Sequence, residues 1–343
     1  MNDLNRNMEA RFSEFDLKNL AGPIQVSFTV TRRCNFLCRH CYNCSGSDIK
    51  DDMSDEMLLD VTDQICSIKP SSVCICGGEP LLRGEIMYTI IKKLSKSISS
   101  VNIVSNGYLI TSEVAKRLKT SGINTLQISL DGNTPFLHNN IRMNSKAFDR
   151  AVSAIKYGVE YGMNVAVSCC PSKLNISKID EMAQFVKALG AVELRLMPLI
   201  TMGRGVQMDK LKPSADEYLV LQQRIHKINS MYSGSGFSVK WGDPLDHLYR
   251  MPMNYKNNMN AYTMEITSNG KLSVTTYLPI IVGDLRCHTL KEYWESGYKD
   301  IWGNESVLKL IRDFYSTSQF ATFKPTPYSG EEVQIMIPIG VTK

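Results

Sequence analysis

Short apolar stretches recur along the first two hundred residues, and each precedes a longer segment whose apolar residues return every three or four positions. The short stretches alternate and are rich in β-branched residues, which is typical of strands, whereas the longer segments have the period of amphipathic helices. This pattern predicts strands at 24–31, 72–76, 101–105, 125–130, 164–169 and 192–197. It predicts helices at 53–68, 86–98, 112–120, 146–161 and 179–189, the first with Ser54 as its N-cap.

Strands that alternate with helices predict an α/β fold with a parallel sheet, because each connection is long enough for a right-handed crossover. The periodicity leaves two architectures open, a doubly wound sheet and a barrel. Each candidate motif directly follows a strand, at Cys34, Gly77, Asn106, Asp131 and Pro171. In a barrel these strand ends would meet on one face, which is where barrel active sites lie.

The regular alternation of predicted strands and helices ends after about residue 203. In this part we expect a helix at 215–228, followed by a Gly/Ser-rich turn at 233–236. A β-hairpin around Asn269-Gly270 is expected at 263–277, and a second helix at 290–302. The last segment, 320–343, contains three prolines and is expected to be extended. We therefore divide the chain into an N-terminal extension (1–23), a barrel (24–205) and a smaller α+β accessory region with its extended tail (206–343).

Composition narrows the class of protein further. No stretch approaches the roughly 20 apolar residues of a spanning helix, and 1–20 lacks an apolar signal core, so we expect a cytoplasmic protein. The net charge is +5 without any Lys/Arg run, which argues against a nucleic-acid or membrane partner. Ten cysteines without a signal sequence argue against a disulfide framework.

Three of the cysteines are spaced like a metal site, in the run Cys34-Asn-Phe-Leu-Cys38-Arg-His-Cys41. Three thiolates at this spacing can hold three irons of a four-iron cluster and leave the fourth iron open to a substrate or cosubstrate. The alternative is a zinc site with Cys44 as fourth ligand, but four ligands within eleven residues would be cramped, and we interpret Cys44 as a bystander. The run 77–80, Gly-Gly-Glu-Pro, follows the next strand, and its glycines allow close approach of the backbone.

Together, the cysteine run and Gly-Gly-Glu-Pro resemble the radical S-adenosylmethionine (SAM) superfamily. The resemblance implies a partial (β/α)6 TIM-type barrel and one [4Fe-4S] cluster held by Cys34, Cys38 and Cys41. It also implies reductive cleavage of SAM to a 5′-deoxyadenosyl radical, which abstracts a hydrogen atom from the substrate. The protein would then be an enzyme of oxidoreductase or lyase type.

The resemblance also assigns SAM contacts. Glu79 would face the methionyl ammonium, Arg142 in a pattern similar to HxxxR would clamp the methionyl carboxylate, and His40 would contact the adenine. The further positions that it implies for SAM are Tyr42, Gly77, Gly78, Pro80, Ser105, Asn106, Ser129, Asp131 and Met197. Asn175 and the run 203–205, Gly-Arg-Gly, also match the family pattern.

The C-terminal region is similar to the SPASM/Twitch-like accessory domain of the peptide-modifying branch, the maturases of ribosomally made peptides. It departs from that pattern at 275–277, where Thr-Thr-Tyr replaces the expected cluster cysteine, and only Cys287 remains nearby. One thiolate cannot hold a cluster, so we expect the accessory fold without auxiliary clusters. Cys287, Cys169 and Cys170 are candidate hydrogen donors, and the alternative for each is an ordinary core thiol.

These features favour the modification of a peptide, by crosslinking, epimerisation or a related reaction. The expected partners are the peptide, an external electron donor of flavodoxin or ferredoxin type, and a separate leader-recognition protein, because only about 23 residues precede the first strand. A radical SAM enzyme that acts on a nucleotide, sugar or tetrapyrrole is the alternative. A non-catalytic iron-sulfur or zinc scaffold is the third hypothesis, and it leaves Gly-Gly-Glu-Pro unexplained.

Overall fold

The computed structural model describes residues 20–242, 244–312, 314, 319, 328 and 330–339. Most of the predicted N-terminal extension and most of the proline-containing tail lie outside the described residues. The first part of the chain contains β1 Gln25–Thr31, α2 Asp55–Ile68, β2 Ser72–Gly77, η1 Pro80–Arg83, α3 Glu85–Ser95, β3 Ser100–Ser105, α4 Ser112–Ser121, β4 Thr125–Ser129, α5 Pro135–Arg142, α6 Ala147–Glu160, β5 Asn164–Cys169, η2 Ile176–Lys178, α7 Ile179–Ala188 and β6 Glu193–Leu196. The second part contains η3 Gly203–Leu211, α8 Ala215–Met231, β7 Ser238–Trp241, α9 Pro244–Lys256, β8 Thr263–Ile266, β9 Lys271–Thr275, β10 Leu278–Asp284, α10 Leu290–Ser296, η4 Tyr298–Gly303, α11 Glu305–Ile311 and β11 Val333–Gln334.

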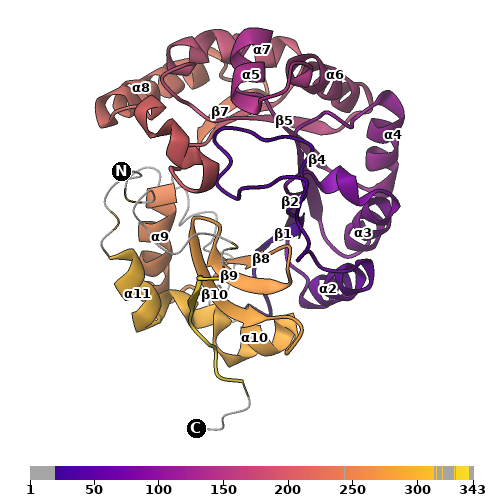
Figure 1. Cartoon of the computed structure of the whole chain (residues 1–343), viewed down its shortest axis with the longest axis vertical. Coiled ribbons are helices and arrows are strands. Elements are labelled where there is room, and N and C mark those ends of the chain that lie inside the picture. Colours follow the sequence, from indigo (N-terminus) through magenta and orange to yellow (C-terminus); the bar gives the residue numbers. More distant parts are fainter. Residues whose placement is uncertain are drawn as a thin grey trace.

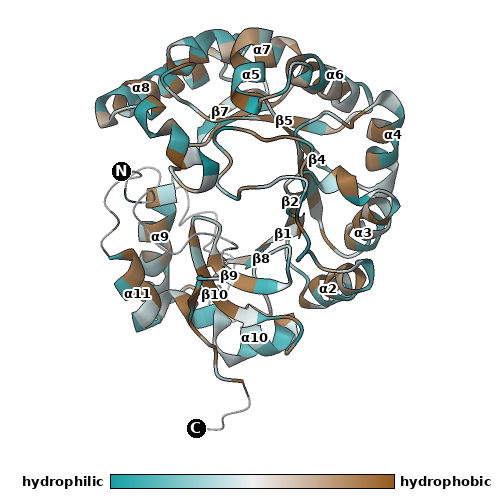
Figure 2. Ribbon diagram, in the orientation of Figure 1, coloured by the Kyte–Doolittle hydropathy of each residue, from teal (hydrophilic) through white to brown (hydrophobic). Residues whose placement is uncertain are grey.

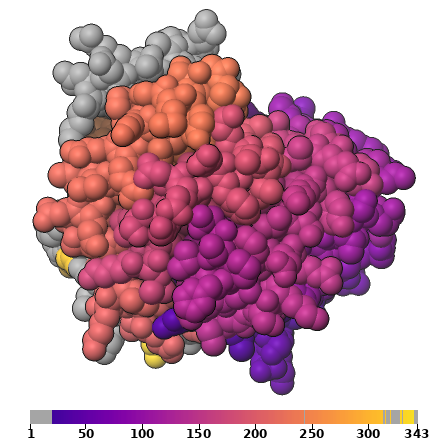
Figure 3. All heavy atoms as spheres, turned by 90° about the horizontal axis from the view of Figure 1, so that it is seen from above, coloured from indigo at the N-terminus to yellow at the C-terminus, as the bar shows by residue number. Residues whose placement is uncertain are grey.

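The strands form one sheet in the order β11-β10-β9-β8-β1-β2-β3-β4-β5-β6-β7. From β8 to β7 all neighbours are parallel, whereas β8, β9 and β10 pair antiparallel. The sheet curves into an incomplete ring with the helices on its outside (Figure 1). Seen from above, the middle of the chain forms one continuous surface with the N-terminal units beside it (Figure 3). The predicted α/β partial barrel is therefore confirmed.

The accessory region joins the barrel more closely than we expected. Its first strand, β8, pairs parallel with β1 and so continues the barrel's own sheet. The hairpin predicted at Asn269-Gly270 is confirmed as β8 and β9, but β7 was not predicted from the irregular pattern around Trp241. The helix predicted over 290–302 is broken at Gly297, whose φ of 140° interrupts it between α10 and η4.

Alternation within each strand separates a core face from a barrel-interior face. In β2, Val73 and Ile75 are fully buried against the helices, whereas Cys74 and Cys76 lie on the opposite face. Each fully buried aliphatic side chain of this kind stabilises the fold by about 1.5–3 kcal/mol. Figure 2 shows the apolar side of the surrounding helices directed at the sheet.

The helix ends follow local rules. Ser54 caps α2, as predicted, by accepting a hydrogen bond from the backbone N–H of Met57 at 3.2 Å. None of the helices in the described residues is both long and apolar enough to cross a membrane.

Candidate cluster and cofactor site

The carboxyl ends of the parallel strands surround a cavity of about 360 Å³. Most of the residues predicted for the cluster, for SAM or for hydrogen donation line this cavity: Cys34, Cys38, His40, Cys41, Tyr42, Gly77, Gly78, Ser105, Asn106, Ser129, Arg142, Cys169, Cys170 and Met197. Four predicted residues are not among its lining residues, namely Glu79, Pro80, Asp131 and Cys287. The structure thus brings together residues from strands β2 to β5 and from the loops that follow β1 and β6.

The three cluster cysteines lie on the loop after β1, and all are free thiols. Backbone N–H groups point at two of the sulfurs, from Phe36 to Cys34 Sγ and from Ser45 to Cys41 Sγ, both at 3.4 Å. Phe36 is buried and anchors the loop. Cys44, by contrast, is exposed and does not line the cavity, as expected for a bystander.

The thiols and their surroundings fit a cluster with an attached cosubstrate. Burial raises the pKa of Cys34 to about 12 and also raises that of Cys38, so metal binding would have to displace their protons. Among the described residues, no three His, Cys, Asp or Glu side chains converge on one point suited to a single metal ion. A cluster would offer a separate iron to each thiolate.

Two buried nitrogen atoms at the cavity call for a further ligand. His40 Nδ1 and Arg204 Nη2 have no hydrogen-bond partner among the described residues, and both side chains line the cavity. A buried polar atom left unpaired costs about 1–3 kcal/mol, so a bound group with acceptor atoms would stabilise this wall. Arg204 also holds the cysteine loop, because its Nε donates to the carbonyl oxygen of Cys38 at 2.9 Å.

The two glycines of Gly-Gly-Glu-Pro are required by backbone packing. A Cβ on Gly77 would lie 2.3 Å from the carbonyl oxygen of Thr31, and one on Gly78 would lie 2.3 Å from that of Arg33. Neither glycine has a positive φ, so their backbone dihedral angles alone do not require glycine. The glycines instead let the end of β2 press against the start of the cysteine loop.

Glu79 holds the next strand end. Its fully buried carboxylate accepts hydrogen bonds from the Leu81 N–H at 3.2 Å, the Ser105 hydroxyl at 3.0 Å and the Asn106 N–H at 2.8 Å. Burial raises the pKa of Glu79 to about 7. Because these donors surround the carboxylate, it positions Ser105 and Asn106 at the cavity wall, and Glu79 is not itself among the lining residues.

Asp131 and Arg142 form a buried ion pair behind the cysteine loop. Arg142 Nε donates to Asp131 Oδ2 at 2.6 Å, and the Cys170 N–H donates to Oδ1 at 3.0 Å. Burial opposes ionisation of Asp131, but Arg142, together with His40, His138 and the Cys170 N–H, outweighs burial and holds the pKa of this carboxyl well below its usual range. Arg142 Nη1 also lies 3.9 Å from Cys38 Sγ, so Asp131 orients a guanidinium that lines the cavity.

The candidate hydrogen donors fall into two groups. Cys169 and Cys170 line the cavity, and burial raises the pKa of both thiols, so both are protonated near neutral pH. Cys287 is exposed after β10 and does not line the cavity. A hydrogen donor must reach the substrate, so the role predicted for Cys287 would require a substrate that extends beyond this cavity.

Other lining residues were missed, notably Cys74 and Cys76 on β2. The signal was present in the sequence, because alternation with Val73 and Ile75 places both thiols on the barrel-interior face. Cys76 Sγ lies 3.3 Å from Thr29 Oγ1 on the neighbouring strand. Further missed residues come from distant segments, among them Ser27, Gln127, Ser168, Pro244, Thr276 and Tyr277.

Residues 28–186 match the family model described as the Radical SAM superfamily. These residues therefore form a radical SAM domain, the domain of a class of enzymes that use a [4Fe-4S] cluster and SAM.

Its relatives include the AdoMet-dependent heme synthase of Methanosarcina barkeri, which is 24% identical over 85% of each chain. The mycofactocin maturase MftC of Mycobacterium tuberculosis is 27% identical over 86% of this chain and 74% of its own. Among solved structures, Streptococcus suis SuiB bound to precursor peptide SuiA is similar with a TM-score of 0.66 and 17% identity, covering 90% of this chain and 70% of SuiB. The structure of anSMEcpe with bound AdoMet is similar with a TM-score of 0.61 and 16% identity, covering 81% of this chain and 82% of its own. These structures support the fold.

Proposed function

We propose that this radical SAM enzyme modifies a peptide, by a crosslink, an epimerisation or a related change. The observation that carries the proposal is the main cavity, which three free thiols line together with residues from the barrel strands. Support for a peptide comes from the relative named as a mycofactocin maturase and from SuiB, which is described with its precursor peptide.

In this proposal Cys34, Cys38 and Cys41 hold the cluster. When bound, the cluster and SAM supply a carbon-centred radical that removes a hydrogen atom from the substrate. The chain positions these groups: Arg142, oriented by Asp131, presents guanidinium donors to the cavity.

The proposal keeps further parts of the expected organisation. Residues 24–205 would form the barrel that carries the cofactors, and 206–343 would form an accessory region without auxiliary clusters. An external electron donor of flavodoxin or ferredoxin type and a separate leader-recognition protein would complete the system.

Anaerobic turnover tests the cluster assignment. We expect the reconstituted enzyme with dithionite and SAM to form 5′-deoxyadenosine, and Cys34→Ala, Cys38→Ala or Cys41→Ala to abolish it. Cys44→Ala is the matched control and should retain activity. Normal product from any of the three cluster variants would refute the assignment.

Mass spectrometry tests the peptide assignment. Short peptides encoded beside the gene should lose two hydrogens, take up deuterium from heavy water or undergo a larger mass shift. If 5′-deoxyadenosine forms and none of these peptides changes, the peptide assignment is wrong although the enzyme class stands.

A tetrapyrrole substrate is the second candidate, favoured by the heme synthase whose similarity spans 85% of both chains. Incubation with a carboxylated porphyrin distinguishes the two, because a change in the porphyrin's absorption spectrum and mass is expected only for the second candidate.

A further inference from the structure

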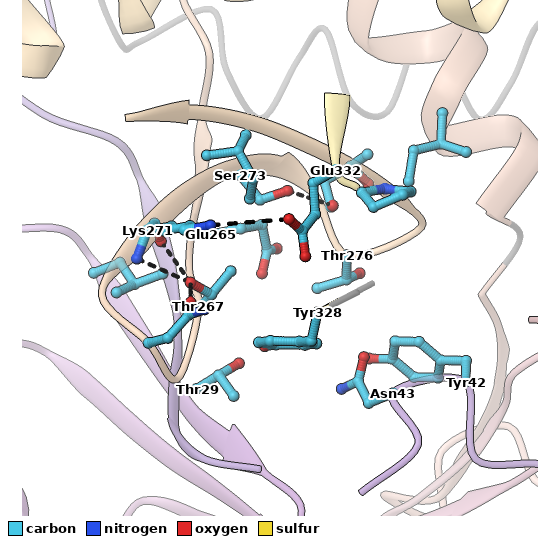
Figure 4. A pocket seen from close by; sticks show the side chains of 16 residues that line it. Thr29, Tyr42, Asn43, Glu265, Thr267, Lys271, Ser273, Thr276, Tyr328 and Glu332 are labelled. Atoms are coloured by element: carbon cyan, nitrogen blue, oxygen red, sulfur yellow. Dashed lines mark hydrogen bonds and ion pairs between the residues drawn. The ribbon is translucent and has the colours of Figure 1, made fainter. Parts of the chain in front are cut away.

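A smaller chamber of about 60 Å³ adjoins the main cavity (Figure 4). It lies between β1, the hairpin strands β8–β10 and the end of the cysteine loop. Tyr42, Asn43 and Thr276 line both spaces, so the chamber opens beside the site proposed for the cofactors. A substrate in the main cavity could therefore place one side chain in the chamber.

Glu265 on β8 directs a carboxyl group into this chamber. Its Cα pairs with that of Ser27 on β1, and the Ser27 hydroxyl makes a hydrogen bond to the carboxyl. The neighbours Met264 and Ile266 are buried in the core, so alternation turns Glu265 toward the barrel interior. Figure 4 shows its carboxyl pointing into the space bounded by Thr276, Tyr328 and Thr29.

A charged carboxyl group at this buried position does not stabilise the fold. Burial raises the pKa of Glu265 to about 8, which means that the surroundings disfavour its charge. Buried charges are normally paired. Yet among the described residues no Lys, Arg or His forms an ion pair with Glu265.

The ionisable groups around Glu265 are neutral near pH 7. Cys74 and Cys76 from β2, Tyr42 from the cysteine loop and Tyr298 from η4 all interact with its charge, and burial raises the pKa of each. None of them can supply the missing positive charge.

Lys271 is the one Lys, Arg or His among the described residues that line the chamber, and it is already engaged. Its Nζ lies 3.8 Å from Glu332 Oε2, and Figure 4 marks this pair with a dashed line. The Glu332 side chain is 5% exposed, and its Oε2 has no hydrogen-bond partner within the described part of the chain. Lys271 thus pairs with Glu332, and among the described residues no cation pairs with Glu265, so an ionised Glu265 would need a positive charge from a ligand.

We propose that this chamber is a substrate subsite in which Glu265 binds an alkylammonium group, either a lysine side chain or the amino terminus of a peptide. The peptide character rests on the proposed function, whereas the preference for an ammonium rests on the chamber alone. An ammonium carries three diverging donors on a narrow stem, which suits a small space ringed by hydroxyl groups better than a planar guanidinium does. When it binds, the Glu265 carboxyl releases its proton to solvent and pairs as a carboxylate.

Binding of n-butylammonium tests the subsite without any turnover. The probe is titrated into the reconstituted, SAM-loaded enzyme and followed by ligand-detected NMR, with 1-butanol as the uncharged analogue. We expect n-butylammonium to bind, 1-butanol to bind far more weakly, and Glu265→Gln to weaken amine binding roughly 10- to 100-fold, as for the loss of a charged hydrogen bond. Glu295→Gln, the same change at an exposed position on α10, is the matched control.

The pH dependence gives a second readout. Between pH 6.5 and 8.5, wild-type affinity should rise as the Glu265 carboxyl ionises, and the affinity of Glu265→Gln should stay flat. Unchanged melting temperature and 5′-deoxyadenosine formation would show that this variant is folded. Equal amine binding by wild type and Glu265→Gln, or no binding to wild type, would overturn the proposal.

Peptide variants distinguish the source of the ammonium. Replacing lysine by norleucine should raise KM if a side chain occupies the chamber, and acetylation of the amino terminus should raise it if the terminus does. If no peptide is converted but n-butylammonium still binds through Glu265, the peptide function fails and the subsite stands. If peptides are converted and neither change nor Glu265→Gln affects KM, the subsite fails and the peptide function stands.

Discussion

Asp131→Asn should destabilise the protein by about 3–5 kcal/mol, the usual cost of removing one partner from a buried ion pair. Asp131 is fully buried, and its two oxygens accept from different donors, Arg142 Nε on Oδ2 and the Cys170 N–H on Oδ1. An asparagine has one oxygen, so its amide NH₂ must face one of these donors. The Arg142 guanidinium, whose side chain is 11% exposed, would also lose its counter-charge.

Urea unfolding of the cluster-free, reduced protein measures this effect, so that loss of the cluster does not contribute. Arg142→Met should cost about the same, because it leaves the Asp131 carboxylate buried and unpaired. The double variant should be less destabilised than the sum of the two by about 2–3 kcal/mol, since neither unpaired charge remains.

The pH dependence has a defined sign. The folded pKa of Asp131 lies below its unfolded value, so the stabilisation is present above the unfolded pKa and is lost as the pH falls through the folded one. From pH 5 to 7 the gap between wild type and Asp131→Asn should therefore be constant. A loss under about 1 kcal/mol, or strict additivity in the double variant, would refute the assignment of Asp131 as the partner that orients Arg142.

Three further changes test other parts of the structure. Gly78→Ala should lower the free energy of unfolding by at least about 1–3 kcal/mol, because its Cβ would meet the Arg33 carbonyl oxygen at 2.3 Å. It should also reduce cluster content on reconstitution, measured by iron and sulfide analysis, and normal iron content would contradict this. Ser54→Ala should cost about 1 kcal/mol in urea unfolding because the Met57 N–H loses its cap, and an unchanged midpoint would argue against the cap. Cys287→Ser should leave 5′-deoxyadenosine formation and substrate conversion intact, since this thiol is exposed and away from the cavity, and a large loss of conversion would restore it as a donor.

Much of the barrel could be predicted because its signals are local. The alternation at 24–31 and the spacing between apolar positions at 53–68 give β1 and α2 nearly as observed. Strand β7 was missed because its four residues carry little pattern, and it is held by pairing with β6. The parallel pairing of β8 with β1 joins segments more than 230 residues apart, which no local pattern encodes.

The site divides in the same way. The cysteine spacing and Gly-Gly-Glu-Pro are contiguous, so they could be found along the chain, and their family assignment is confirmed. The direction in which a side chain points cannot be found in this way. Whether Glu79 faces the cavity depends on Ser105 and Asn106, which donate hydrogen bonds to its carboxylate from the end of another strand.

The sequence by itself determined the class of this protein, since the order of strands and helices and two short motifs suffice to place it among the radical SAM enzymes. Only the tertiary structure decided which of ten cysteines reach the cavity and which carboxyl groups are paired. Glu265 is the clearest case. Within its strand it is a polar residue between two apolar ones, and only the packing of β8 against β1 encloses it in a chamber where no cation of the described residues pairs with it. The burial of a side chain and its ion pairs are set by neighbours distant in sequence. The charge state of a residue such as Glu265 is therefore decided by the tertiary structure.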